Sequence, residues 1–395
     1  MLKARSMTQR TSTLLVGAFA ALAACTAAPD GSSEETDVTA SGDASSGEGS
    51  SAATGSTGED GTTSTGSASD SSSASTSGEA GTAPTSGMTE GPTAGTTDTS
   101  SSTGGPVDYQ DVYPLAGTYP EGGAFDPVDE LFFVGTLEGG DVYRVDPRDG
   151  SSELFFAGSK PGLWMTLGMA IDAERRRLWV CAADRQEDPY TGEVWVFDLE
   201  SGARDHVIPL MAGDEAAWCE DIAVAGDGRA YATDRENPNI YRIEGGEASL
   251  FASDEALGSN LIGQNGIVVL PGDDVLIAAV HLPSRLNRVS LADGTVTPID
   301  IEGDFVDAGI GSGADGMVYV DGGLYVIFDG ELARVEPTLG DWSAVYSTAV
   351  ELPRGLTDVV QTPAGLYLIN GQAIGFAFGQ DPNGPFQLVR YTGDL

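Results

Sequence analysis

The segment NGIVVLPGDDVLIAAVHLPSRLNRV, residues 265–289, contains the pattern from which the fold can be predicted. A polar residue and a glycine precede an apolar run, a Pro-Gly turn leads into a second apolar run, and a third run ends in Arg-Val. Short runs rich in Val and Ile between turn residues are typical of β-strands, and helical periodicity is scarce. The segment therefore predicts three consecutive antiparallel strands that begin at Asn265.

The same layout recurs along the second part of the chain. The repeats begin at Glu121, Leu167, Glu220, Asn265, Asp315 and Thr357. These starts are 42 to 53 residues apart, which is the length of a four-stranded propeller blade. We therefore expect residues 109–395 to form an all-β domain, a six-bladed β-propeller. Residues 109–118 are expected to close the ring as the outer strand of a shared blade. A pair of stacked β-sheets is the alternative.

Residues 1–25 have the features of a bacterial export signal. Three basic residues precede an apolar run over residues 14–22, which ends in Leu22-Ala23-Ala24-Cys25. This run is shorter than a membrane-spanning helix requires. The last four residues resemble the lipobox of bacterial lipoproteins, in which the cysteine is lipidated. We expect lipidation at Cys25 and a location in the cell envelope at the outer membrane, on its periplasmic side or at the cell surface. An ordinary secretory signal is the alternative.

Residues 26–108 differ in composition from the rest of the chain. They contain no Lys, no Arg and no aromatic residue, and Ser, Thr, Gly, Ala, Asp and Glu make up nearly all of them. Such a segment cannot bury enough apolar surface to offset the conformational entropy lost on folding. We therefore expect a disordered acidic linker between the lipid anchor and the propeller.

The charge of the chain excludes several kinds of partner. Its 395 residues include 60 acidic and 19 basic side chains, a formal net charge of −41. This excludes nucleic-acid binding through phosphate neutralisation. It also disfavours docking on anionic lipids through a basic patch, so the lipid anchor is the membrane contact we expect. The sequence does not predict the number of subunits.

The first residue of each repeat forms the column that carries chemistry. If each one begins the innermost strand of a blade, the six side chains surround the mouth of the central channel. Glu121, Glu220 and Asp315 supply carboxylates, and Asn265 supplies an amide. Converging carboxylates repel one another and lose hydration unless a cation neutralises them. Because the donors are oxygens, the column predicts a hard divalent cation, Ca²⁺ first and Mg²⁺ or Mn²⁺ as alternatives. Alternatively, the Asn-Gly and Asp-Gly pairs are turn residues at strand starts.

Three blade starts resemble a known family. Glu121-Gly122, Gln264-Asn265-Gly266-Ile267 and Ala314-Asp315-Gly316-Met317 are similar to motifs of the senescence marker protein/gluconolactonase/luciferin-regenerating enzyme family. These proteins are six-bladed propellers of the calcium-dependent phosphotriesterase-like superfamily. The resemblance spans residues 109–395, and paraoxonase-like and strictosidine-synthase-like propellers share the Asn-Gly-Ile start. It implies that Glu121, Asn265 and Asp315 are metal ligands, that Asp315 is also a general base, and that the substrate is a lactone or related ester.

Repeat three departs from that family, which has Arg-x-Asn-Asp-Gly where this chain has Trp218-Cys219-Glu220-Asp221-Ile222. In the family, the Arg and the first Asn contact the substrate. Here Trp218 and Glu220 replace them, whereas Asp221 matches. We therefore expect Trp218 and Asp221 to contact substrate, and Glu220 to be a fourth ligand or an alternative catalytic base.

His281 and two cysteines complete the candidates. His281 follows the second strand of repeat four, where it would contact substrate and shuttle protons with a pKa of about 6.5, or serve as a structural loop histidine. Cys181 and Cys219 lie in adjacent repeats of a domain expected to be exported, which allows a disulfide. Their spacing alone does not decide it.

Two functions follow from these features. The first is a metal-dependent hydrolase that acts on a small lactone or ester. The second is a non-catalytic propeller, displayed at the surface, that binds a ligand or partner and holds a structural calcium.

Overall fold

The computed structural model describes residues 107–158, 164–184, 191–212, 215–303, 313–328 and 330–393. The predicted leader with its lipidation site Cys25, and all but the last two residues of the predicted linker, lie outside the described residues. Within these ranges, no helix has the length and apolar character needed to cross a bilayer.

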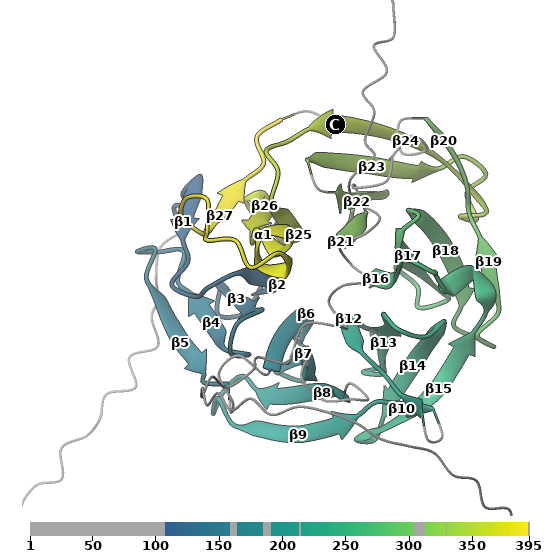
Figure 1. Ribbon diagram of the computed structural model, residues 1–395, viewed down its shortest axis with the longest axis horizontal. Coiled ribbons are helices and arrows are strands. Elements are labelled where there is room, and N and C mark those ends of the chain that lie inside the picture. Colours follow the sequence, from purple (N-terminus) through teal and green to yellow (C-terminus); the bar gives the residue numbers. More distant parts are fainter. Residues whose placement is uncertain are drawn as a thin grey trace, which may run out of the picture. The chain divides into compact units, whose positions relative to one another are not determined.

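Six sheets of four or five strands are arranged around a common axis, as the blades of a propeller (Figure 1). The prediction of a six-bladed propeller is confirmed, and the stacked-sheet alternative is excluded. The innermost strands are β2, β6, β12, β16, β21 and β25, and the strands of each blade follow outward from them.

The strand bounds are as follows. Blade one contains β2 (Pro120–Asp126), β3 (Leu131–Thr136), β4 (Val142–Val145) and β5 (Ser152–Phe156). Blade two contains β6 (Trp164–Asp172), β7 (Arg177–Asp184), β8 (Thr191–Asp198) and β9 (Arg204–Pro209). Blade three contains β12 (Cys219–Val224), β13 (Ala230–Asp234), β14 (Asn239–Glu244) and β15 (Glu247–Ser253). Blade four contains β16 (Ile262–Val269), β17 (Val275–Leu282), β18 (Arg285–Ser290) and β19 (Val296–Pro298).

The last two blades recruit strands from outside their own repeat. Blade five contains β21 (Ala314–Val320), β22 (Gly323–Phe328), β23 (Glu331–Pro337) and β24 (Ala344–Glu351), and β20 (Asp300–Gly303) pairs in parallel with β24. Blade six contains β25 (Leu356–Thr362), β26 (Gly365–Asn370), β27 (Gln387–Arg390) and β1 (Val112–Pro114). Short elements between blades are β10 (Met211–Ala212), β11 (Glu215–Ala216) and the 3₁₀ helix η1 (Glu255–Leu257).

Strand β1 closes the ring by pairing antiparallel with β27. Tyr113 of β1 is fully buried, and its ring centroid lies 5.7 Å from those of Phe132 in blade one and Tyr367 in blade six. The Tyr367 hydroxyl also donates to the carbonyl of Gln110 at 2.6 Å. Both ends of the domain therefore hold one blade together, and the closure predicted from residues 109–118 is confirmed.

The second strand of a blade is apolar on both faces because each blade packs between two others. In β7 the segment Leu178–Asp184 is buried along its whole length. Such strands appear as continuous apolar runs and not as an alternating pattern, which is why the repeats stand out in the sequence.

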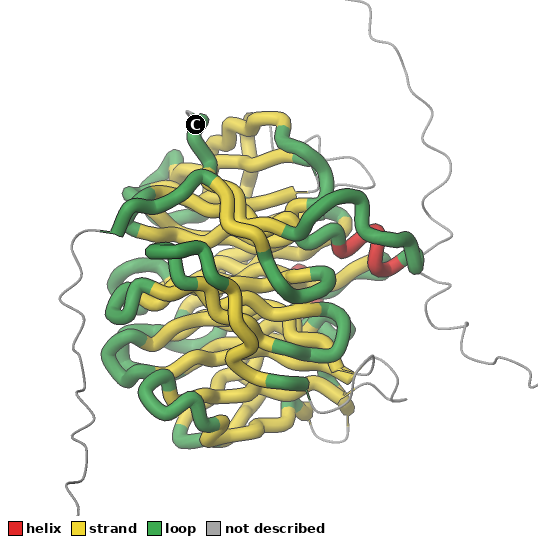
Figure 2. The backbone as a smooth tube through the Cα atoms, turned by 90° about the vertical axis from the view of Figure 1, so that its left-hand side faces the viewer, coloured by secondary structure: helices red, strands yellow, loops and turns green. Residues whose placement is uncertain are grey.

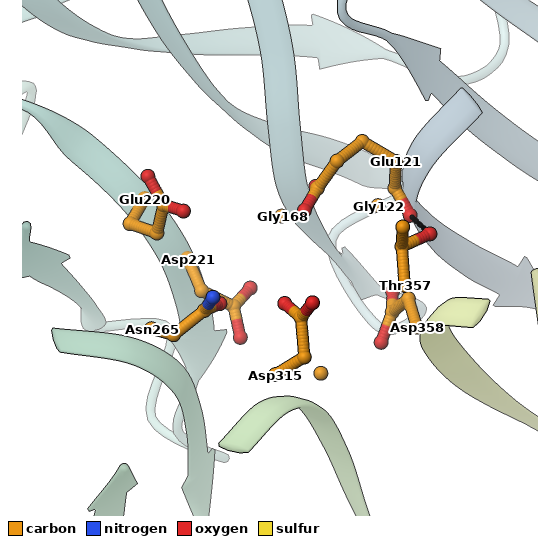
Figure 3. Close-up of a pocket in the computed structure, with 10 residues that line it drawn as sticks. Glu121, Gly122, Gly168, Glu220, Asp221, Asn265, Asp315, Thr357 and Asp358 are labelled. Atoms are coloured by element: carbon orange, nitrogen blue, oxygen red, sulfur yellow. Dashed lines mark hydrogen bonds between the residues drawn. The ribbon is translucent and has the colours of Figure 1, made fainter. Parts of the chain in front are cut away.

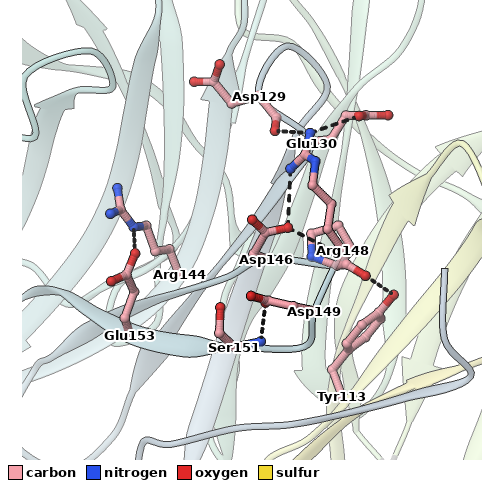
Figure 4. Close-up of polar contacts among 10 residues, drawn as sticks. Tyr113, Asp129, Glu130, Arg144, Asp146, Arg148, Asp149, Ser151 and Glu153 are labelled. Atoms are coloured by element: carbon pink, nitrogen blue, oxygen red, sulfur yellow. Dashed lines mark hydrogen bonds and ion pairs between the residues drawn. The ribbon is translucent and has the colours of Figure 1, made fainter. Parts of the chain in front are cut away.

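The hairpin between the third and outer strands uses the same turn in three blades. The amide of a glycine in the left-handed region donates at 2.8 Å to the carbonyl four residues earlier, at Gly150, Gly202 and Gly294. In blade one the Asp146 carboxylate accepts from the amide of Arg148 at 2.8 Å, and Arg148 also pairs with Glu130 (Figure 4). The side-chain oxygen of the aspartate thus supports the tight turn that glycine permits.

One face of the propeller carries the starts of the inner strands. Because neighbouring strands are antiparallel, the second strand of each blade ends at this same face. The segment between β26 and β27 therefore lies there too, and it contains the short helix α1 (Ala373–Ala377), seen in side view in Figure 2.

Candidate metal centre at the propeller axis

A β-bulge interrupts every innermost strand at the predicted column. Between the two paired positions that flank each bulge, the inner strand has one residue more than the second strand of the blade. The interruptions fall between Pro120 and Gly123, Thr166 and Met169, Cys219 and Ile222, Gln264 and Ile267, Ala314 and Met317, and Leu356 and Asp358. A bulge redirects side chains locally. Six bulges at equivalent positions therefore bring at least one of the first two residues of every repeat to the propeller axis.

These residues enclose a small cavity on the axis. It is lined by Glu121, Gly122, Gly168, Glu220, Asp221, Asn265, Asp315, Gly316, Thr357 and Asp358. Its volume is about 10 Å³, which has room for one water molecule or one ion. Figure 3 shows Asp221, Asn265 and Asp315 together in the middle, with Glu220 and Thr357 at opposite sides.

The structure brings together five of the six column residues, and the sixth, Leu167, is buried in the core. It also adds Asp358, which is not part of the column of repeat starts. The signal was present, because Thr357-Asp358 occupies the place in repeat six that Glu220-Asp221 occupies in repeat three. The cavity is therefore bounded by five carboxylates.

Among the described residues, the Glu121 and Asp315 carboxylates have neither an ion pair nor a hydrogen bond from a backbone amide. The Glu121 residue is 8% exposed, and neither its carboxylate nor that of Asp315 forms an ion pair within the described part of the chain. Burial raises the pKa of Glu121 well above its usual value, and the charges of Asp315 and Glu220 raise it further. The pKa of Asp315 is raised by burial and by Glu220, against a hydrogen bond from Asn265 that lowers it.

Glu220 is satisfied by two donors. The Trp218 indole Nε1–H donates to its Oε2 at 2.6 Å, and the Arg235 guanidinium lies 3.3 Å from its Oε1. The Arg235 guanidinium carbon also lies 5.7 Å from the Trp218 ring centroid. Burial raises the pKa of Glu220, and Arg235 opposes that rise. The predicted substrate contact by Trp218 stays a prediction, since this buried residue acts here as a donor to Glu220.

Asp221 and Asp358 connect neighbouring blades. In each, one oxygen accepts from the amide of the next residue at 2.7 Å. The other accepts from the following blade, from Ile267 at 2.9 Å for Asp221 and from Gly123 at 2.8 Å for Asp358. The two carboxylates are equivalent positions three blades apart. The predicted contact of Asp221 with substrate is untested by these bonds, which occupy both of its oxygens.

His281 lies beside the axial carboxylates, between Asn265 and blade five. Its Nδ1 is 2.9 Å from the carbonyl of Ala314 and 3.3 Å from the Asn265 amide nitrogen. Burial and the charge of Arg235 lower its pKa to about 4, so the ring is neutral near pH 7. A neutral Nδ1–H can donate to the Ala314 carbonyl. The expected pKa of about 6.5 is therefore not found, and substrate contact by His281 stays a prediction.

Cys181 of β7 and Cys219 of β12 form a disulfide with a Cα–Cα distance of 5.1 Å. The spacing of the two cysteines in the sequence does not decide this pairing. Since Cys219 immediately precedes Glu220, the bond ties the start of β12 to blade two.

The predicted ligands fit a hard cation by their chemistry. Glu121, Asn265 and Asp315 offer two carboxylates and one amide oxygen, and the unpaired Glu121 carboxylate is more than nine-tenths buried. Among the described residues, no three Asp, Glu, His or Cys side chains are placed to share one ion. The predicted set does not require such a trio, because an amide is its third ligand.

The fold and the axial oxygens define a six-bladed propeller with a candidate cation site. No protein-family model matches the sequence, and no curated protein is similar to it. Solved structures do match. The major allergen Mala s 1 of Malassezia sympodialis matches with a TM-score of 0.57 and 17% identity, over 71% of this chain and 95% of the allergen.

A gluconolactonase of Xanthomonas campestris matches with a TM-score of 0.50 and 16% identity, over 70% of this chain and 87% of that enzyme. A protein of unknown function from Bacteroides thetaiotaomicron has a TM-score of 0.51 and 15% identity, over 69% of each chain. At these identities the likeness shows the fold. The resemblance noted in the blade starts thus extends to a fold shared with a gluconolactonase propeller.

Proposed function

We propose that this protein is an exported, lipid-anchored hydrolase that opens lactones or related esters with the help of a divalent cation at the propeller axis. The observation that carries the proposal is the ring of carboxylates around an ion-sized cavity, in which Glu121 and Asp315 form no ion pair within the described residues. Buried carboxylates without a counter-ion are costly unless they are protonated or bind a cation.

Glu121, Asn265 and Asp315 would hold the cation, with Ca²⁺ as the first choice and Mg²⁺ or Mn²⁺ as alternatives. When bound, such an ion supplies Lewis acidity toward a carbonyl oxygen and makes water more acidic. A carboxylate must take the proton from the attacking water. Glu220 already accepts from Trp218 and Arg235, so we assign this role to Asp315.

Lactones are the first substrate class to test because the Xanthomonas protein of the same fold is a gluconolactonase. The sugar-lactone contacts of that family are changed here at Trp218 and Glu220. We therefore expect a different preference among lactones and esters, with Trp218, Asp221 and His281 as candidate substrate contacts.

Export is supported by two independent features, and anchoring is supported by the first of them. The leader ends in Leu22-Ala23-Ala24-Cys25, and the folded domain contains the Cys181–Cys219 disulfide. Structural disulfides persist mainly in oxidising compartments outside the cytosol. Cys25 would carry the lipid, and the anchor would be the contact with the membrane.

The test is hydrolysis of a panel of small lactones and esters by the full-length chain, with Ca²⁺ and with chelator. We expect Glu121→Gln and Asp315→Asn to lower turnover at least about a hundredfold. Each variant replaces a charged ligand by a neutral amide, and Asp315→Asn also removes the base. Glu153→Gln, which alters an exposed ion pair with Arg144, is the control and should be unaffected. Full turnover in both axial variants would exclude the proposed mechanism.

The size of the cavity favours a second candidate, a non-catalytic propeller with a structural cation. A volume of about 10 Å³ accommodates an ion but no substrate. This function predicts that Ca²⁺ raises the melting temperature while no lactone or ester in the panel is hydrolysed.

A further inference from the structure

Arg235 provides a positive charge next to the axial carboxylates. It directly follows β13, and its amide donates to the carbonyl of Trp218 at 3.1 Å. Its guanidinium pairs with Glu220 at 3.3 Å and lies against the face of the Trp218 ring. Its side chain is 27% exposed, whereas that of Glu220 is 4% exposed.

The carboxylates that line the axial cavity therefore differ in their partners. Asp221 and Asp358 accept backbone amides, and Glu220 accepts from Trp218 and Arg235. Glu121 has neither kind of partner among the described residues, although it is more than nine-tenths buried and lines the cavity. A carboxylate held by a guanidinium and an indole is a weaker candidate ligand than a free one.

We propose that Arg235 keeps Glu220 out of the ligand set of the axial cation, and thereby limits both the affinity for the cation and the preference for Ca²⁺ over Mg²⁺. This inference rests on the cation of the proposed function. Arg235 acts through Glu220 and is a positioning residue.

Two physical effects predict the direction of the change. Removing the guanidinium deletes a positive charge near a divalent ion, which strengthens cation binding. It also frees Glu220 Oε1 to become an additional ligand. Ca²⁺ accepts six to eight oxygens in flexible geometry, whereas Mg²⁺ is restricted to near-octahedral coordination, so an added ligand benefits Ca²⁺ more.

The test is calorimetric titration of the full-length chain with Ca²⁺ and, separately, with Mg²⁺. We expect Arg235→Gln to bind Ca²⁺ about tenfold more tightly than the wild type, with a smaller gain for Mg²⁺. Arg235→Lys keeps the charge and should stay near the wild type. Arg235→Gln combined with Glu220→Gln should lose the gain, because the freed ligand is gone.

A second variant keeps the inference testable if Arg235→Gln does not fold. Glu220→Gln leaves Arg235 without its carboxylate, and we expect Ca²⁺ to bind several-fold more weakly. Unchanged or weaker Ca²⁺ binding by Arg235→Gln, or an equal gain for both ions, would overturn the inference while leaving the hydrolase intact. If neither wild type nor variant binds either ion, the inference and the metal part of the proposed function both fail.

Discussion

Glu121 and Glu220 are equivalent residues of blades one and three, and they are buried to a similar degree. They differ because repeat three supplies Trp218 and Arg235 as donors to Glu220. The column of repeat starts predicted that both carboxylates face the channel, but not that one of them is already neutralised. Arg235 is 15 residues from Glu220 and lies outside the repeated motif, so only the folded arrangement reveals the pair.

His281 is expected to stay neutral throughout the physiological pH range. Its pKa is lowered to about 4 by burial and by Arg235, so protonation requires acid solution. We expect its imidazole carbon shifts in ¹³C NMR to remain constant from pH 8 to pH 5.5 and to change only near pH 4. The chain has two histidines, so a His206→Gln variant assigns the signals. A transition of His281 near pH 6.5 would show that the imidazole is less buried than described.

The inner strands of neighbouring blades approach one another very closely around the axis. A Cβ added to Gly168 would lie 1.9 Å from Oδ1 of Asp221, and one added to Gly316 would lie 1.8 Å from Oδ1 of Asp358. These glycines therefore make room for the carboxylates that connect neighbouring blades. The sequence indicated the Gly-containing starts, but glycine at a strand start is also typical of a turn, and the close approach is visible only between blades.

Gly168→Ala is expected to destabilise the propeller by about 2 kcal/mol or more. The Asp221 carboxylate must move, and the two hydrogen bonds that it accepts from backbone amides become weaker. The measurement is chemical denaturation of the variant and the wild type. Gly375→Ala in α1 is the matched control, since the added Cβ meets no atom closer than 4.0 Å. A Gly168→Ala protein as stable as the control would show that the Asp221 contact contributes little.

For the whole propeller, the spacing of the repeats predicted the number of blades, and the closure by residues 109–118 was an additional expectation that the spacing itself did not require. Five of the six repeats begin with a polar residue, repeat two begins with Leu167, and an apolar run follows in all six. The parallel addition of β20 to blade five was not predicted, because its short segment, Asp300–Gly303, carries no apolar run. The disulfide could not be predicted either, since it depends on the distance between blades.

Two buried aspartates, Asp358 at the axis and Asp234 at the end of β13, predict an unusual dependence of stability on pH. Burial raises the pKa of Asp358 to about 7 and that of Asp234 to about 6, from ordinary values of 3.8. Between the ordinary and the raised pKa the folded state binds more protons than the unfolded state, so stability falls as pH rises. In the presence of a chelator, we expect the melting temperature of the protein to be about 5 °C or more lower at pH 7.5 than at pH 5.

Ca²⁺ should reverse this trend, because deprotonated carboxylates bind the ion and protonated ones do not. The stabilisation by Ca²⁺ is therefore expected to be larger at pH 7.5 than at pH 5, measured by thermal melting in matched buffers. A melting temperature that is independent of both pH and Ca²⁺ would contradict the electrostatic description of the axis.

The axial cation is tested most directly by anomalous diffraction from crystals of the protein grown with Mn²⁺. We predict one strong anomalous peak on the propeller axis, bounded by Glu121, Asn265 and Asp315, and its loss in Glu121→Gln. An axis without a peak at saturating Mn²⁺ would show that these carboxylates do not hold a divalent cation.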